Sequence, residues 1–171
     1  MEIRLSAARL RPWQWGDEKT YVRHANNRNV SRNLRDRFPY PYTTADAQEW
    51  LHGQVGRLPV TAFAIEVNGE AAGGIGLQLQ SDIARRSAEI GYWLGEAHWG
   101  RGIMTEAVRA VTNYGVRDLD LIRIFASVFE RNLASVRVLE KAGYVLEGHF
   151  RKAAIKDGEV LDELMYAIVR D

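Results

Sequence analysis

The stretch Glu89–Val108, EIGYWLGEAHWGRGIMTEAV, constrains the fold more than any other part of this chain. It passes from an apolar, strand-like run into a helical run through Gly100, Arg101 and Gly102, with neither a proline nor an obvious cap at the start of the helix. A helix N-terminus presents unpaired N–H groups and the positive end of the helix dipole, so it favours anions. The glycines let a ligand approach the backbone. This pattern predicts a phosphate-binding loop between a central strand and a helix.

Two familiar phosphate-binding motifs do not fit this stretch. A P-loop needs G-x-x-x-x-G-K-[ST], and the dinucleotide fingerprint needs a third glycine three residues after Gly102, where Thr105 stands. On these residues alone, a glycine turn with a surface arginine explains the stretch as well as a ligand site does. Further motifs must decide between the two interpretations.

The make-up of the chain indicates one globular domain. It has 171 residues, 46% hydrophobic and 26% charged, enough to bury one core, so we expect a single domain over residues 1–171. The formal net charge is +1, with acids and bases interspersed, which predicts neither a nucleic-acid nor a membrane partner. Cysteine is absent, and arginines interrupt the N-terminal stretch where a signal peptide would be apolar. We therefore expect a soluble, cytoplasmic protein.

Hydrophobic periodicity predicts seven strands and four helices. Thr43 followed by Asp46 resembles a capping box, and the pair Asn68–Gly69 predicts a type I′ hairpin turn, with a second hairpin at Asp157–Gly158. The expected strands cover residues 3–13, 61–67, 70–80, 87–94, 122–129, 144–156 and 160–169, and the expected helices cover 16–27, 43–54, 104–119 and 132–143, with a short helical turn and a loop over 29–42. This order predicts an α+β (mixed α/β) fold, with a central twisted mixed sheet, flanking helices and a strand-helix-strand crossover.

A second motif follows at the next junction between a strand and a helix. The run from Asn132 to Tyr144 satisfies N-x-x-[AS]-x-x-x-[YL]-E-K-x-G-[FY], and Trp99–Met104 occupies the six places of Q/R-x-x-G-x-G/A. Together with RLRPW near the N-terminus and KDGEVLDELMYAIVRD at the end, the chain resembles the GNAT superfamily of acyl-CoA-dependent N-acyltransferases. Its EIGYWL, WGRG and TEA are similar to the branch of ribosomal-protein N-terminal alanine and serine acetyltransferases.

The resemblance implies an acetyl-CoA site built largely from backbone. Amides of the loop are expected to hold the pyrophosphate, and the end of the preceding strand is expected to hydrogen-bond pantetheine. The residues implied in coenzyme binding are Tyr92, Trp93, Leu94, Trp99, Gly100, Arg101, Gly102, Ile103, Met104, Thr105 and Asn132. Trp99 and Met104 depart from the usual residues, which a site made of N–H groups tolerates. No metal is implied, and the chain's histidines are scattered without metal-ligand spacing.

The resemblance also implies a general base. A primary amine is largely protonated at pH 7, so a base must take a proton before the amine can attack. Glu89 matches a glutamate that many relatives carry on this strand, and it is the expected base. The alternative is that Glu89 only pairs with Arg85 or Arg86 beside it, and Glu130 is the second candidate.

The expected acid is less usual. Leu139 stands where many relatives carry a tyrosine that protonates the departing thiolate, and leucine cannot donate a proton. Ser135 lies one helical turn earlier on the same face and is the expected substitute. An equal alternative is that Ser135 only hydrogen-bonds the helix backbone or the coenzyme.

The sequence therefore predicts an acetyl-CoA-dependent N-acetyltransferase that acts on a primary amine by direct attack in a ternary complex. The acceptor is a protein N-terminal α-amine or a small-molecule amine, and a homodimer is compatible with the sequence. Phe38, Tyr40 and Tyr42 fall in the loop where the family closes over acceptors. Two alternatives stay open: a non-catalytic acyl-CoA-binding or regulatory module, which Leu139 favours, and a nucleotide-binding protein, which the missing P-loop lysine disfavours.

Overall fold

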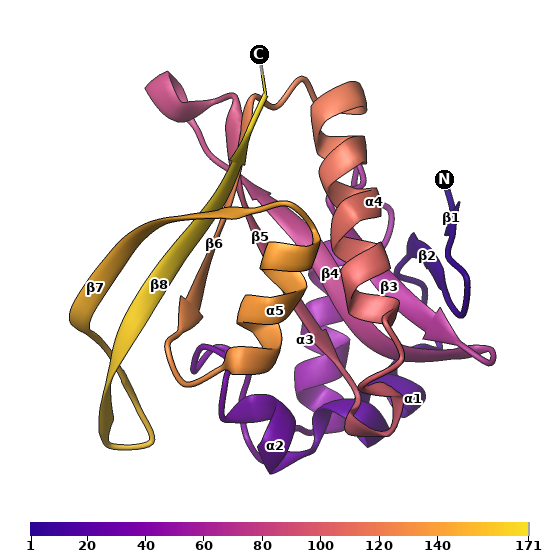
Figure 1. The fold of residues 1–171 in the computed structure, drawn as a ribbon. Coiled ribbons are helices and arrows are strands. Elements are labelled where there is room, and N and C mark those ends of the chain that lie inside the picture. Colours follow the sequence, from indigo (N-terminus) through magenta and orange to yellow (C-terminus); the bar gives the residue numbers. More distant parts are fainter. Residues whose placement is uncertain (171) are drawn as a thin grey trace. The chain divides into compact units, whose positions relative to one another are not determined.

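The computed structural model describes residues 1–170 and has the expected mixed α+β architecture (Figure 1). It refines the expected elements to eight strands and five helices in this part of the chain. The expected first strand becomes two, because the backbone turns where the Leu5 N–H donates to the Ala8 carbonyl at 2.9 Å. The additional helix is a single turn within the segment expected to contain one.

The elements follow one another closely in the chain. The strands are β1 (Ile3–Arg4), β2 (Arg9–Pro12), β3 (Ala62–Val67), β4 (Glu70–Leu79), β5 (Ser87–Leu94), β6 (Arg123–Phe129), β7 (Val145–Lys156) and β8 (Glu159–Val169). The helices are α1 (Glu18–Ala25), α2 (Arg28–Ser31), α3 (Thr44–Gln54), α4 (Ile103–Asp118) and α5 (Leu133–Lys141), with 3-10 turns η1 (Asp82–Ala84) and η2 (Glu96–His98). No helix within residues 1–170 has the length and apolar character needed to cross a membrane.

The sheet has the strand order β1-β2-β3-β4-β5-β6-β8-β7. Strands β5 and β6 are parallel over Ser87–Glu89 and Arg123–Phe125, so α4 forms the expected crossover. The pairs β1–β2, β2–β3, β3–β4, β6–β8 and β7–β8 are antiparallel. Both expected hairpin turns have two residues with positive φ, 51° and 83° at Asn68–Gly69 and 53° and 79° at Asp157–Gly158, as a type I′ turn requires.

The chain forms two compact units, each assembled from two segments. The first unit contains residues 1–76 and 92–107, and the second contains residues 77–91 and those from 108 onward. Strands β4 and β5 and helix α4 each contribute residues to both units. A single domain over residues 1–171 stays a prediction.

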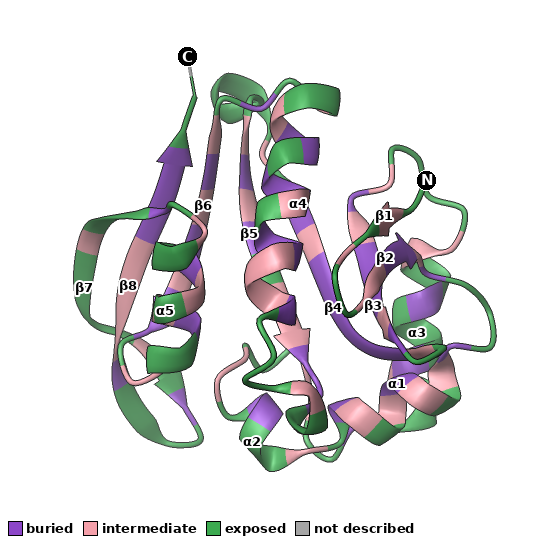
Figure 2. Cartoon of the chain, turned by 45° about the vertical axis from the view of Figure 1, so that its right-hand side comes forward, coloured by how far each residue is buried: buried purple, intermediate pink, exposed green. Residues whose placement is uncertain are grey.

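An aromatic core holds the first unit together, and its residues are among the buried ones in Figure 2. The ring of Tyr21 on α1 lies 5.1 Å from that of Trp13 and 5.1 Å from that of Tyr42. The Tyr42 hydroxyl donates to the Tyr21 hydroxyl at 3.0 Å, which satisfies two buried polar groups. The expected capping box is present at the start of α3, where Thr43 and Asp46 each bind the other's backbone N–H.

A buried ionic network anchors β2 in the first unit. Arg11, only 4% exposed, donates two hydrogen bonds to the carboxylate of Asp17 at 2.7 and 2.8 Å, and its Nε donates to Glu66 at 2.5 Å. Arg9 binds the other oxygen of Glu66 at 2.6 Å. Hydrogen bonds from Arg11 and Arg9 hold the pKa of Glu66 below its usual value, against the opposing effect of burial. Each charge has its partners, as a buried ionic group requires.

The second unit packs α5 against one face of the sheet formed by β6, β8 and β7 (Figure 1). Leu139 of α5 is fully buried, and the Tyr166 hydroxyl of β8 donates to Glu140 of α5 at 3.2 Å. Alternate residues of β6 point to this face and are buried: Ile124, Ala126 and Val128. The residues between them, Phe125 and Ser127, point to the opposite face and are half-buried.

Candidate functional site

The predicted phosphate-binding loop runs from the end of β5 into α4, in the first unit. Its two glycines have left-handed backbone conformations, with φ of 72° at Gly100 and 78° at Gly102, which other residues adopt only with strain. A Cβ built on either glycine meets no atom within 4 Å, so the backbone of this loop is open to a ligand. The glycines therefore do both things expected of them: they make the turn, and they expose its backbone.

Trp99 has a structural task that the sequence did not indicate. Its indole N–H donates to the carbonyl of Leu94 at 2.7 Å, and this bond fastens the loop to the end of β5. The ring is 46% exposed and lies beside the glycines in the chain. The side chain of Trp99 therefore has a structural role in the loop, separate from the backbone binding expected at this position.

Arg101 lies on the loop next to a neutral histidine. Its guanidinium donates to Nδ1 of His98 at 3.3 Å. Burial lowers the pKa of His98, and the nearby His24 and Arg101 lower it further. His98 is therefore neutral at pH 7 and accepts the hydrogen bond, which leaves the positive charge of this pair on Arg101.

The strand end Tyr92–Leu94 leads directly to the loop. Trp93 packs against Tyr21 and Phe38, with ring centroids 5.0 and 5.3 Å away, so this ring serves packing in the first unit. The Trp93 carbonyl would lie 2.5 Å from a Cβ on Gly73 of β4, so only glycine allows this close approach of β4 to β5. Leu94 is buried and Tyr92 is half-buried.

The first turn of α4 contains Ile103, Met104, Thr105 and Glu106. Ile103 is buried and anchors the turn, while Met104 and Thr105 are half-buried. Glu106 lies in the first turn, where an acid complements the positive end of the helix dipole, and it accepts a hydrogen bond from the Ser6 N–H at 2.8 Å. The N-terminal segment is thereby attached to the helix that follows the loop.

The expected base belongs to the second unit. Glu89 is half-buried on β5 and pairs in parallel register with Phe125 of β6, where the pairing of the two strands ends. The alternative partners have other contacts: Arg86 donates to the carboxylate of Asp120 at 2.7 Å, and Arg85 donates to the carbonyl of Asp82 at 3.3 Å.

The structure brings Asn132 and Ser135 together at the start of α5. The Asn132 side chain caps the helix by accepting the Ser135 N–H at 3.3 Å, a structural role that the sequence interpretation did not assign. Ser135 is buried in this first turn, with 9% of its surface exposed. Leu139 is fully buried in the core of the second unit, where it acts as a packing residue.

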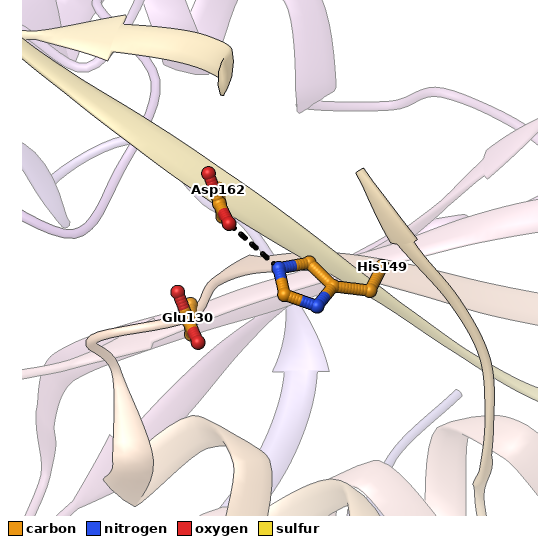
Figure 3. A group of neighbouring side chains, drawn as sticks. All are labelled: Glu130, His149 and Asp162. Carbon is orange, nitrogen blue, oxygen red and sulfur yellow. Dashed lines mark hydrogen bonds and ion pairs between the residues drawn. The ribbon is translucent and has the colours of Figure 1, made fainter. Parts of the chain in front are cut away.

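Glu130, His149 and Asp162 meet near the β7–β8 hairpin (Figure 3). The sequence interpretation had treated His149 as one of the scattered histidines and Glu130 as the second candidate base, and it had not singled out Asp162. Atoms of Glu130, His149 and Asp162 lie within 4.8 Å of one another. His149 Nε2 binds one oxygen of Asp162 at 2.7 Å, and the Lys152 N–H donates to the other at 2.8 Å. These two bonds lower the pKa of Asp162. Both carboxylate oxygens are used to close an irregular part of the β7–β8 hairpin.

Of the three aromatic residues in the loop expected to close over acceptors, Phe38, Tyr40 and Tyr42, two pack in or against the core of the first unit. Phe38 packs against Tyr42 at 4.7 Å between ring centroids, and both are part of that core or packed against it. Tyr40 is exposed and lies under the guanidinium of Arg28, 5.4 Å from its ring centroid. Tyr40 is therefore the ring of the three that is left at the surface.

Comparisons with known proteins agree with this geometry. Residues 8–145 match the family model described as acetyltransferase (GNAT) domain. Probable N-acetyltransferase YjcK of Bacillus subtilis (strain 168) is 51% identical over 86 residues, which are 50% of this chain and 48% of that protein. Ribosomal-protein-serine acetyltransferase of Escherichia coli (strain K12) is 33% identical over 86 residues, 50% of this chain and 48% of that protein.

A solved structure extends the likeness to most of the chain. Mycobacterium smegmatis RimJ, in complex with CoA-disulfide, aligns with a TM-score of 0.81 and 26% identity, covering 95% of this chain and 81% of that one. The alignments to the two curated relatives span about half of their lengths.

Proposed function

Because the chain belongs to the acetyltransferase (GNAT) domain family, we propose that it transfers the acetyl group of acetyl-CoA to a primary amine. The observation that carries this proposal is the open loop at Gly100 and Gly102, whose positive φ values lead into a helix of 16 residues. Such a helix start suits a pyrophosphate, because N–H groups and the helix dipole point at the ligand. Arg101 adds a positive charge.

The coenzyme would be held mainly by main-chain groups. Residues 99–105 would bind its pyrophosphate, and the backbone of Tyr92–Leu94 would bind pantetheine. Asn132, whose side-chain oxygen caps α5, would offer its amide nitrogen to the coenzyme. The substitutions Trp99 and Met104 are compatible with this role, because side chains are not the ligands.

Starting from an ammonium, the transfer removes two protons from the nitrogen and supplies one to the departing sulfur. Glu89 takes the first proton from the acceptor ammonium, and the neutral nitrogen attacks the thioester carbonyl. The nitrogen then loses its second proton as the carbon–sulfur bond breaks, and the coenzyme leaves as a thiolate. Ser135 either donates a proton to that thiolate or only binds the coenzyme, since a thiolate is a tolerable leaving group by itself.

Two classes of acceptor are chemically open to this site. A protein N-terminal α-amine is supported by the similarity to the E. coli enzyme, whose name specifies a ribosomal-protein serine. A small-molecule amine needs the same removal of one proton. A module that binds acyl-CoA without turnover is the second candidate, because the buried Leu139 cannot supply a proton.

The test is release of the coenzyme thiol from acetyl-CoA in the presence of N-terminal peptides, polyamines, amino acids and aminoglycosides. We expect amine-dependent thiol release and an acetylated product of matching mass. Stabilisation of the protein by CoA without thiol release from any acceptor would favour the binding module. If CoA does not stabilise the protein and no acceptor causes thiol release, both candidates are contradicted.

A further inference from the structure

Two carboxylates share one face of the sheet in the second unit, the face opposite α5. The parallel register places Glu89 beside Phe125, and the antiparallel register places Phe129 beside Glu163. Residues paired in register point to the same side of a sheet, and so do alternate residues of one strand. Glu89 and Glu163 therefore point to the face that also carries Phe125, Ser127 and Met165.

Glu163 differs from the acid next to it in the chain. Asp162 points to the α5 face, where both of its oxygens are bound by His149 and Lys152. Glu163 is half-buried and, within residues 1–170, its side chain makes no hydrogen bond or ion pair. A carboxylate that is partly removed from water without a partner is unfavourable for folding alone. A ligand that brings a positive charge would supply what is missing.

The surroundings of Glu163 suit a cation. Its register partners on the two neighbouring strands are both aromatic, Phe129 on β6 and Phe150 on β7, and aromatic faces attract cations. The arginines bordering this face already have acidic partners: Arg123 binds Glu147, and Arg131, which lies 5.9 Å from the Phe129 ring centroid, binds Glu159. Glu163 is thus an acid of this face in excess of those pairs.

The two carboxylates lie too far apart for a single ammonium group of a ligand to contact both of them. Glu89 and Glu163 are two strands apart, roughly 10 Å, and four residues apart along the strands, roughly 13 Å. The surface between them is largely apolar, with the half-buried Phe125 and Met165. A ligand that matches this pattern has two cationic ends joined by a hydrocarbon chain.

We infer that Glu163 binds a second ammonium group of the acceptor, and that the acceptor is a linear diamine or polyamine. This inference rests on the proposed function, because the reacting nitrogen is the one placed at Glu89. The methylene chain crosses the apolar strip, and the far ammonium pairs with Glu163 between the two aromatic rings. Glu163 is then a specificity residue that distinguishes a diamine from a monoamine.

The experiment compares matched acceptors. Spermidine and 1,8-diaminooctane are tested against octylamine, which has the same chain as the diamine without the second cation, and kcat/KM is obtained from thiol release. We expect the diamine to exceed the monoamine by about tenfold or more, the range of one charge-assisted hydrogen bond. Glu163→Gln should reduce that ratio about tenfold, mainly through KM. Asp162→Asn removes the neighbouring charge on the other face and should leave the ratio unchanged.

Equal ratios in wild type and Glu163→Gln would overturn the inference, as would a preference for N-terminal peptides over both diamines. If the wild type acetylates no amine, the proposed function fails separately. Calorimetric titration of spermidine into each protein then decides the role of Glu163. Binding that is lost in Glu163→Gln and kept in Asp162→Asn supports the inference, whereas equal binding in all three proteins, or none in the wild type, overturns it. Circular dichroism melts show whether each variant is folded.

Discussion

The two units differ in how they treat their charged side chains. In the first, Arg11, Asp17, Glu66 and Arg9 form a network in which each charge has an opposite partner within 2.7 Å, and three of the four are buried or nearly so. In the second, Glu163 is half-buried on a sheet face without a partner among residues 1–170. In the first unit, the fold itself supplies the opposite charges that buried ionic groups need. A half-buried carboxylate without such a partner can gain one only from a bound ligand. Charges of the first kind hold the structure together, and we propose that a charge of the second kind meets a ligand.

Breaking the closed network should have the largest effect on stability. Arg11→Met leaves the carboxylates of Asp17 and Glu66 without their shared partner, which costs about 3–5 kcal/mol of unfolding free energy for a buried pair. Urea denaturation followed by circular dichroism measures the loss. The control is Arg9→Gln, since the side chain of Arg9 is 41% exposed and water screens its ion pairs, so this change should cost much less stability than Arg11→Met. Similar small losses in both variants would mean that the network is not a structural anchor.

Removing the proposed base tests whether a carboxylate of the second unit acts in chemistry. Glu89→Gln should lower kcat/KM by on the order of a hundredfold, most strongly at low pH, where the amine is hardest to deprotonate. CoA should still stabilise the variant, because the residues proposed to bind the coenzyme, 99–105, are unchanged. A variant with the wild-type rate and pH profile would assign Glu89 a structural role and move Glu130 forward as the base.

The loop of the first unit can be tested with two glycines of like conformation. Gly102 has φ of 78° and Gly56 has φ of 76°, and neither has an atom within 4 Å of an added Cβ. Gly102→Val and Gly56→Val should therefore lose similar stability, about 1–2 kcal/mol each, from the left-handed backbone. Only Gly102→Val should abolish the thermal shift caused by CoA. An intact shift in Gly102→Val would place the coenzyme elsewhere.

The smallest expected effect is the acid sensitivity of the closed network. The pKa of Glu66 lies below its ordinary value of 4.5, first because of the hydrogen bond from Arg11. A depressed pKa in the folded state means that the ionised group stabilises the fold above its ordinary pKa, and that this contribution is lost as pH falls through the folded value. Unfolding free energies between about pH 3 and about pH 7 should fall less steeply on the acid side for Glu66→Gln than for wild type. Parallel curves would show that Glu66 is not a source of acid sensitivity.

Structural features that depend on a few neighbouring residues could be predicted from the sequence, and several of these predictions were confirmed. The capping box at Thr43 and the type I′ turns at Asn68–Gly69 and Asp157–Gly158 depend on a few adjacent residues, so short patterns identify them. The parallel crossover through α4 followed from the order of strands and helices. The roles of the individual site residues stay predictions.

The additional tasks of two site residues were not predictable in the same way. Trp99 binds the carbonyl of Leu94, five residues away, and this bond exists only because η2 brings the chain back to the strand end. Asn132 was expected to hold the coenzyme, and it also caps α5. A coenzyme motif and a helix cap use the same residue type here, so the sequence pattern alone could not reveal the second task.

The amino-acid sequence by itself determined the elements of this protein, its hairpin turns, its glycine loop and its family, because each depends on residues close together in the chain. The tertiary structure decided which side chains of the second unit meet. Counted back from the Asp157–Gly158 turn, a regular hairpin would place His149 opposite Tyr166, but irregularities between Phe150 and Ala154 place it opposite Leu164 instead. That shift also sets Phe150 beside Glu163. Register depends on packing and on bulges along the whole strand, and therefore only the folded chain shows that Asp162 is satisfied while Glu163 faces the other side of the sheet unpaired.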